Sequence, residues 1–308
     1  MSDLLVFDLP MRVRFRRQTR RSGVLLRGAA GWGEFSPFPD YDAATCTRWL
    51  AAAREAADDG WPSPVRDSVP VNTTVPAVGP QQAHALVTGS GCATAKVKVA
   101  EPGQTLADDL ARVEAVRDAL GRTGKLRVDA NAAWSVDEAV AALKGLDAFD
   151  LEYAEQPVAT LEEMAELRRR VDVRLAADES VRTADDPMRI AGLDAADIVV
   201  LKVQPLGGVR RCLDVAAACG LPVVVSSAVE TSVGIAAGVA LAAALPELPF
   251  ACGLGTVSLL DGDVTADSLM PVDGQLPVRR VEPDQALAHA DEQLTSWGLD
   301  RMRAAADA

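Results

Sequence analysis

The chain has 308 residues, 49% of them hydrophobic and 24% charged, and its formal net charge is −13. This length and composition allow one large folded domain, or one large and one small domain, with a substantial core. The acidic balance argues against nucleic acid or an anionic membrane as the main partner, because both attract clustered positive charge. No apolar run approaches the roughly 20 residues that a membrane-spanning helix needs.

Residues 1–68 are expected to form a small α+β capping domain together with the tail, residues 272–308. The elements expected in it are antiparallel strands within residues 3–15 and 22–39, a helix over residues 42–60, and a strand followed by a helix in the tail. A short basic stretch, residues 12–21, is interpreted as a solvated loop.

Residues 69–271 are expected to form a parallel α/β barrel. A short apolar strand that ends in a polar residue is followed by a turn and an amphipathic helix, and this unit recurs at intervals of roughly 20–30 residues. Eight strands separated by seven segments predict a (β/α)7β variant of the TIM barrel. A doubly wound open sheet is disfavoured, because the chain has no Gly-rich dinucleotide turn after its first strand. The strands are predicted within residues 69–77, 95–100, 125–131, 150–157, 173–180, 197–205, 221–230 and 250–256.

Charged side chains recur near the ends of these predicted strands. In chain order they are Lys98, Asp129, Glu155, Asp178, Lys202 and Glu230, at intervals of 31, 26, 23, 24 and 28 residues. Taken singly, each charged residue is typical of a solvent-exposed strand or of a helix cap. These explanations do not account for six charged residues that fall in register on successive strands. Side chains at one level of a barrel meet at its C-terminal mouth, where such folds hold their chemistry. Lys96 lies on the same face as Lys98, and Asn131 on the same face as Asp129.

Three of these carboxylates predict an oxygen-only metal site. The chain has two histidines, which rules out a His-rich site and argues against a Ser-His-Asp triad. Asp129, Glu155 and Asp178 are therefore expected to bind Mg²⁺, with Mn²⁺ as an alternative. Without a cation, three converging anions would repel one another and take up protons. An ammonium beside a dication and a second ammonium should have a depressed pKa, so Lys98 or Lys202 could act as a base near neutral pH.

An ordered set of motifs resembles the muconate-lactonising branch of the enolase superfamily. The motifs are "KVK" (96–98), "DAN" (129–131), "EQP" (155–157), "DES" (178–180) and "LKVQPLGG" (201–208), and the cap segment "GWGEFSPFP" (31–39) also matches. The resemblance covers essentially the whole chain. Within the branch, "SSAVETSVG" (226–234) and "GLGT" (253–256) are most similar to the o-succinylbenzoate synthase family, and the short "RRQTRRSG" (16–23) resembles its actinobacterial members.

This resemblance implies a dehydration in menaquinone biosynthesis. Lys98 would remove the proton α to the carboxylate of 2-succinyl-6-hydroxy-2,4-cyclohexadiene-1-carboxylate, and Mg²⁺ would stabilise the ene-diolate. Protonated Lys98 would then assist loss of the hydroxyl from the same face. Lys202 would be a cation on the opposite face, and Lys96 would lower the pKa of Lys98. The residues with implied supporting roles are Asn131, Glu179 and Glu230 around the metal ligands, and Ser226, Ser227, Gly253 and Gly255 for the succinyl carboxylate.

Other functions remain open from the sequence. Two opposed lysines also suit an N-acylamino acid racemase or a dipeptide epimerase of the same superfamily, or more weakly a cycloisomerase. A metal-free Schiff-base aldolase using Lys98 or Lys202 belongs to a different class. A non-catalytic binding barrel would leave the paired lysines unexplained.

The compartment and the partners are also predicted. A cytoplasmic location is expected, because the start of the chain lacks a signal-peptide pattern and its five cysteines are scattered. The expected partner is a small carboxylate substrate, with neither nucleic acid nor a membrane. The choice between monomer and homo-oligomer is left open.

Overall fold

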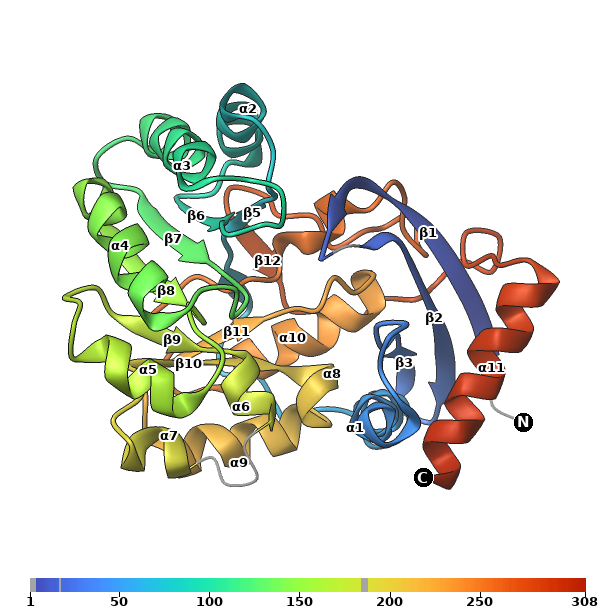
Figure 1. Cartoon of the computed structure of the whole chain (residues 1–308). Coiled ribbons are helices and arrows are strands. Elements are labelled where there is room, and N and C mark those ends of the chain that lie inside the picture. The colour runs from blue at the N-terminus through green and yellow to red at the C-terminus, as the bar shows by residue number, and fades with distance from the viewer. Residues whose placement is uncertain (1–3, 17, 184–187) are drawn as a thin grey trace.

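The computed structural model describes residues 4–16, 18–183 and 188–308, which form a barrel with a small α+β layer on one side (Figure 1). The strands are β1 (Leu4–Phe15), β2 (Gln18–Gly28), β3 (Gly31–Phe35), β4 (Ser68–Pro70), β5 (Thr73–Val75), β6 (Thr94–Lys98), β7 (Lys125–Asp129), β8 (Leu151–Glu155), β9 (Leu175–Ala177), β10 (Ile198–Lys202), β11 (Val223–Ser226) and β12 (Gln275–Pro277).

The α-helices alternate with the barrel strands after β5 and also occur in the cap. They are α1 (Ala43–Arg54), α2 (Pro80–Ser90), α3 (Leu106–Leu120), α4 (Val136–Leu146), α5 (Leu161–Arg168), α6 (Glu179–Thr183), α7 (Met188–Gly192), α8 (Val203–Leu206), α9 (Val209–Cys219), α10 (Ser232–Ala244) and α11 (Glu292–Asp307). A π-helical turn (Glu55–Asp59) extends α1, and 3-10 turns occur at Asp147–Phe149 and Gly255–Leu259. Within the described ranges no helix is long and apolar enough to cross a membrane.

The barrel is a closed ring in which the eighth strand is reduced to two bridges. Seven parallel strands lie in the order β11-β10-β9-β8-β7-β6-β5. Cys252 forms a parallel bridge with Val71, just before β5, and Gly253 forms one with Ser226 at the end of β11. These contacts join the two edges of the sheet, so the predicted (β/α)7β class is confirmed and the open doubly wound alternative is excluded.

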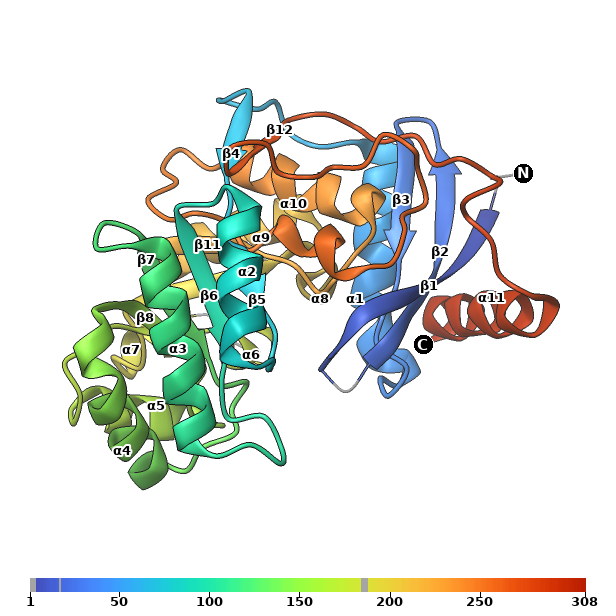
Figure 2. The ribbon, with the colours of Figure 1, turned by 90° about the horizontal axis from the view of Figure 1, so that it is seen from above.

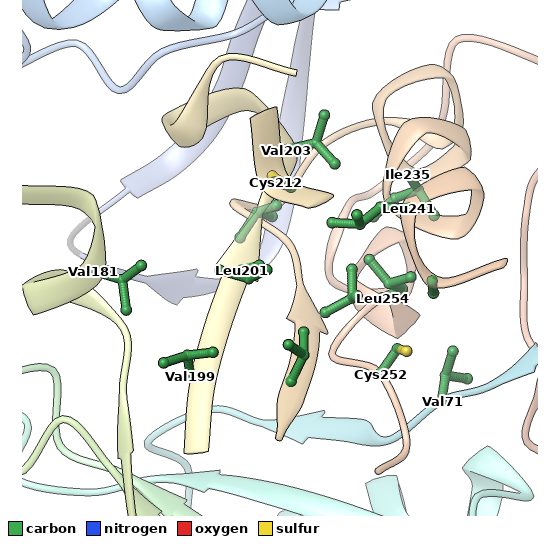
Figure 3. Packing of buried hydrophobic residues seen from close by; sticks show 14 of the residues in the cluster. Val71, Val181, Val199, Leu201, Val203, Cys212, Ile235, Leu241, Cys252 and Leu254 are labelled. Carbon is green, nitrogen blue, oxygen red and sulfur yellow. The ribbon is translucent and has the colours of Figure 1, made fainter. Parts of the chain in front are cut away.

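Side chains alternate between the inside and the outside of the barrel, as the two-residue period of a strand requires. On β10, Ile198 and Val200 belong to an apolar cluster inside the ring, which also contains Tyr153 and Phe250. The intervening side chains, Val199 and Leu201, pack in the larger core between the sheet and its helices (Figure 3). Lys202 continues the inward series, so the apolar interior supports a charged layer at the C-terminal end of the ring.

Ser and Thr caps begin α3 and α4, as the sequence predicts. Thr105 and Ser135 form capping boxes with the residue three positions later, at the starts of α3 and α4. Each box satisfies backbone N–H groups that have no partner within the first turn. Helix starts fixed in this way place each preceding strand end, and its polar residue, at the same edge of the barrel.

The cap combines both ends of the chain, as predicted. β1, β2 and β3 form an antiparallel sheet, and α11 lies against β1 and β2 on the side away from the barrel (Figure 2). β12 of the tail pairs with β4 next to the first barrel strand. The exact domain boundaries, at 68/69 and 271/272, stay predictions.

The structure corrects the interpretation of residues 12–21 as a solvated loop. Arg12 and Arg20 are largely exposed, but Arg21 is only 2% exposed and is buried between the cap and the barrel. The turn between β1 and β2 lies over the barrel mouth, and Arg16 in this turn is half-buried there. Arg17 lies outside the described residues. The composition of this basic stretch predicts solvent exposure. Whether its side chains are buried depends on where the hairpin packs, which the local sequence does not show.

Candidate active site

The predicted charged residues lie together at the C-terminal ends of the barrel strands. Strand register places Lys98 opposite Asp129, and Asp129 opposite Glu155. Asp178 directly follows β9, and Lys202 ends β10. These five side chains are each 7% exposed or less. The periodic spacing in the sequence therefore corresponds to one buried layer of charge, in which three carboxylates on successive strands lie between two lysines.

Lys96 is the most tightly paired of the three lysines. Its Nζ donates to both carboxylate oxygens of Glu155 at 2.8 Å and lies 3.2 Å from Oδ2 of Asp129. Burial opposes the charged form, but Glu155 and Asp129 outweigh it and raise the pKa of Lys96 above its ordinary value. Lys96 is thus a fixed cation, unsuited to taking up a proton.

Lys98 has the opposite electrostatic environment. Its Nζ lies 2.6 Å from Oδ2 of Asp129 and 2.5 Å from Oδ1 of Asn131, and 5.0 Å from the centre of the Phe15 ring. Burial is the main cause that lowers the pKa of Lys98; Asp129 opposes this, while Lys96 and Arg16 lower it further. A lowered pKa makes Lys98 the better candidate for a base.

Asp178 is held between two cations from different elements. Its Oδ2 accepts from Nζ of Lys202 at 2.5 Å and from Nη2 of Arg182 at 3.2 Å. Burial opposes ionisation of this carboxyl, but Arg182 and Lys202 outweigh it and hold the pKa of Asp178 well below its ordinary value. Asp178 is therefore an anion in the folded protein.

Glu155 shows the cost of crowding carboxylates. Burial and the neighbouring charge of Asp129 raise the pKa of Glu155 to about 7, against the effect of Lys96. The pKa of Asp129 itself is lowered, because Lys98, Lys96 and Lys202 outweigh its burial. The three carboxylates thus depend on the neighbouring lysines, or on a bound proton, to balance their charge in this buried layer.

The predicted metal ligands are adjacent but do not converge in this conformation. Within the described residues, no three Asp, Glu, His or Cys side chains are grouped closely enough to hold a metal ion as they stand. Asp129, Glu155 and Asp178 each bind an ammonium instead. One buried acceptor is unused: Oδ1 of Asp178 has no hydrogen-bond partner among the described residues. Three buried carboxylates on successive strands, with an open acceptor, fit an oxygen-ligated divalent cation.

A small enclosed cavity lies between the lysines. Its volume is about 20 Å³, room for one or two water molecules. β6 and β10 lie four positions apart in an eight-membered ring, so Lys98 and Lys202 reach the cavity from opposite sides. The residues that line it are Phe15, Arg16, Thr74, Lys96, Lys98, Asp129, Lys202, Ser226, Ser227, Ala228, Val229, Gly253 and Thr256.

Only some of the predicted substrate-contact residues lie at this cavity. Ser226, Ser227 and Gly253 line it, whereas Gly255 lines a neighbouring cavity beside β5 and α2. The Ser227 hydroxyl donates to the carbonyl oxygen of Gly253 at 2.8 Å. A Cβ on Gly253 would lie 2.5 Å from Ser226 Oγ, so a glycine is required for this close approach.

The predicted supporting residues occupy two different places. Asn131 joins Lys98 to Glu179, which also pairs with Arg16 of the cap at 3.1 Å. Glu230 lies in the loop after β11, where it accepts from the backbone N–H of Ala228 at 2.6 Å. Asn131 and Glu179 thus border the three buried carboxylates, while Glu230 braces the loop that lines the cavity.

Sequence reasoning missed Arg182 and the contribution of the cap. Arg182 had a usable signal, since it lies four residues after Asp178 at the start of a helix, a spacing that brings side chains together. Phe15 and Arg16 had none, because only the packed cap brings the hairpin turn over the lysines. These two residues close the cavity from above.

Comparison with known proteins identifies the family of the chain. Residues 80–283 match the family model described as "Enolase C-terminal domain-like", and residues 6–57 match "Enolase N-terminal domain-like". The chain therefore belongs to the enolase superfamily, whose members generally depend on a divalent metal. The superfamily resemblance inferred from the strand-end motifs is confirmed.

More similar relatives show which family within the superfamily the chain resembles. The chain is 64% identical, over 94% of its length and 92% of the relative's, to o-succinylbenzoate synthase of Thermobifida fusca (strain YX). It is 54% identical, over 98% and 93% of the two chains, to o-succinylbenzoate synthase of Mycobacterium tuberculosis (strain ATCC 25618 / H37Rv). Within the superfamily, the chain thus belongs with the o-succinylbenzoate synthases.

Solved structures of distant relatives share the fold. Muconate lactonizing enzyme from Pseudomonas fluorescens superimposes with a TM-score of 0.79 at 23% identity, covering 96% of this chain and 98% of that one. The L-Ala-D/L-Glu epimerase from Bacillus subtilis gives 0.78 at 22% identity, covering 92% and 97%. At these identities the likeness establishes the barrel and cap alone, and does not favour racemisation or cycloisomerisation.

Proposed function

We propose that this chain is an o-succinylbenzoate synthase, a carbon–oxygen lyase that dehydrates 2-succinyl-6-hydroxy-2,4-cyclohexadiene-1-carboxylate to o-succinylbenzoate in menaquinone biosynthesis. High identity to curated synthases over nearly the whole chain supports the activity. The observation that carries the mechanism is the placement of Lys98 and Lys202 on opposite sides of one enclosed cavity, above three buried carboxylates.

Lys98 is proposed as the base and then the acid. Its neutral amine takes the proton from the carbon next to the substrate carboxylate. The ammonium formed on Lys98 then returns a proton to the departing hydroxyl on the same face, so that water leaves and the C–H electron pair completes the aromatic ring. Support comes from the lowered pKa of Lys98, caused first by burial.

Lys202 and Lys96 are proposed to remain cations. Lys202 ends β10 on the far side of the cavity, where its charge can stabilise negative charge that develops on the substrate. Lys96 is bound to Glu155, so its ammonium stays close to Lys98 and favours the neutral amine there. These roles follow from position and charge, and neither ammonium transfers a proton to or from the reacting carbon.

Asp129, Glu155 and Asp178 are proposed to hold Mg²⁺, with Mn²⁺ as an alternative. The bound cation would supply charge stabilisation at the substrate carboxylate as the α-proton is removed. For the carboxylates to bind it, Lys98 and Lys202 must release Asp129 and Asp178, which would also free both amines to face the substrate. Asn131 already holds Lys98 on its other side and can keep it in place.

Substrate entry is proposed to require outward movement of the β1–β2 turn. A cavity of about 20 Å³ cannot hold a six-membered ring with its side chain. Phe15 lies directly on Lys98, and Arg16 is tied to Glu179 at 3.1 Å. Once the turn has moved outward, Ser226, Ser227 and Gly253 would contact the succinyl group. Their positions on the cavity wall support this role.

A spectrophotometric assay with the cyclohexadiene acid and Mg²⁺ tests this proposal. Wild type and the surface variant Lys144→Ala should turn over equally, whereas Lys98→Ala and Lys202→Ala should lose turnover by a factor of at least about 100. Absence of turnover, together with rapid racemisation of N-succinylamino acids, would assign the chain to the racemases instead. Activity that persists after exhaustive chelation, with borohydride trapping on a lysine, would indicate a Schiff-base aldolase.

We also propose the compartment in which the enzyme works. Its substrate is a small carboxylate, and its five cysteines are buried, which supports a reducing, cytoplasmic compartment. Fractionation of cells that produce the chain tests the location directly.

A further inference from the structure

A strained residue forms part of the cavity wall. Val229, in the loop after β11, has a φ of 63° and is 3% exposed. Among the residues that the structure describes, it is the one β-branched residue with a positive φ. The left-handed region is unfavourable for such a side chain, so the surroundings must impose this conformation on the loop.

Arg21 of the cap makes the contact that holds Val229. Its Nε donates to the carbonyl oxygen of Val229 at 3.0 Å, and its Nη2 donates to the carbonyl of Ser36 at 2.6 Å and to Ser36 Oγ at 3.2 Å. The guanidinium lies 4.5 Å from the centre of the Phe38 ring. Arg21 is 2% exposed, so these contacts hold its planar guanidinium in one orientation.

Ser36 of the cap also contacts helix α8, which directly follows the strand that carries Lys202. Backbone N–H of Ser36 donates to Oε1 of Gln204 at 3.1 Å, and Nε2 of Gln204 donates to Ser36 Oγ at 3.3 Å. Gln204 lies two residues after Lys202. Ser36 thus links Arg21, and through it Val229, to the end of β10.

We propose that Arg21 is a positioning residue for substrate binding: it holds Val229 in its left-handed conformation and so fixes the wall formed by residues 226–229. Arg21 is not itself among the residues that line the cavity. It acts through the backbone of the loop, while Glu230 braces the same loop from within by accepting from Ala228. The inference rests on the proposed function for the identity of the substrate.

The structure provides a matched control on the same strand. Arg20 is adjacent to Arg21, but its guanidinium is largely exposed and binds Asp8 at 2.6 Å within the cap. Arg21→Lys keeps the charge and loses the planar fork, and Arg20→Lys makes the same chemical change away from the loop. A general effect of the arginine-to-lysine change would appear in both variants.

Kinetics separate positioning from a merely structural role. Arg21→Lys should raise KM by about 10-fold with kcat within about threefold of wild type, as expected for loss of hydrogen bonds to a charged donor. Arg20→Lys should leave both constants unchanged. Lower kcat with unchanged KM would mean that Arg21→Lys only reduces the folded fraction, and would overturn the inference.

A second substitution tests the route through Val229. Glycine adopts a positive φ without steric cost, so the loop needs less support in Val229→Gly. The KM increase caused by Arg21→Lys should therefore shrink from about 10-fold to less than about threefold when it is measured in the Val229→Gly background. An equal increase in both backgrounds would show that Arg21 does not act through this residue.

Deuterium uptake by the peptide covering residues 223–234 tests the loop without any substrate. It should be faster in Arg21→Lys than in wild type and Arg20→Lys, because the loop amides open more often. Equal uptake in all three proteins would overturn the inference even if the enzyme is active. If wild type fails to dehydrate the cyclohexadiene acid, the proposed function falls, and the uptake result alone decides whether Arg21 holds the loop.

Discussion

The buried carboxyl of Glu34 should make folding stability depend on pH. Glu34 lies on the cap strand β3, and its side chain reaches the start of α10, where it accepts from Thr231 N–H at 3.1 Å and from Gly234 N–H at 3.0 Å. Burial and the nearby carboxyl of Glu230 raise the pKa of Glu34 to about 7, against hydrogen bonds from Ser36 and Thr231 and the charge of Arg21.

The sign and size of the effect follow from proton linkage. Between its ordinary value of 4.5 and about 7, the Glu34 carboxyl binds a proton in the folded protein and loses it in the unfolded chain. Stability from this group is therefore fully present below pH 4.5 and is lost as the pH rises through 7. At about 1.36 kcal/mol for each pH unit, the loss amounts to about 3 kcal/mol.

Urea unfolding at pH 5, 6, 7 and 8 measures this loss. Relative to Glu34→Gln, wild type should lose about 3 kcal/mol of unfolding free energy between pH 5 and 8. The exposed-site variant Glu114→Gln should follow wild type at every pH. If wild type instead gains stability with pH relative to Glu34→Gln, the donors at α10 and Arg21 keep Glu34 ionised, and the reasoning from burial is refuted.

Three further perturbations test the packing and the metal site. Gly234→Ala places a Cβ 2.6 Å from Cβ of Glu230 and should lower the free energy of urea unfolding by about 1–3 kcal/mol. In the control Gly89→Ala, the new Cβ has no atom within 4 Å, so this variant should not be destabilised. Asp178→Asn should weaken Mg²⁺ binding in calorimetry by more than about 100-fold, and wild-type affinity would contradict its role as a ligand. Arg127→Met removes the ion-pair partner of Glu152 at 2.6 Å and should lower the free energy of unfolding by about 3–5 kcal/mol. A loss below about 1 kcal/mol would contradict a buried ion pair.

The barrel and its charged layer could be predicted because both are periodic. Each βα unit repeats the same strand, turn and helix, so one polar residue per strand end is enough to place Asp129, Glu155 and Asp178 in neighbouring positions. The strand lengths were predicted too generously: β11 ends at Ser226, and helix α8 begins directly after Lys202. Local sequence does not show where a strand stops pairing, since pairing depends on the neighbouring strand.

The cap side of the site could not be predicted, because it depends on packing between segments that are far apart in sequence. Arg21 and Arg16 belong to a basic stretch whose composition is typical of solvent-exposed loops, yet one is buried and the other lies over Lys98. The lysine–carboxylate pairs were also unexpected. The sequence showed which charges share a layer, but their pairing depends on distances of a few ångströms set by side-chain conformation.

The joining of the two chain ends in one cap affects how the molecule is made. Arg301 of α11 donates to the backbone carbonyls of Pro37 and Phe38, more than 260 positions earlier. Contacts between such distant segments form late, because closing a long loop costs entropy before any contact is gained. During synthesis the barrel strands emerge before α11 does, so a nascent chain can complete its charged layer before α11 covers the cap. Arg21 packs against Phe38, which lies in the segment that Arg301 contacts. This segment gains its last contacts only after α11 has been synthesised.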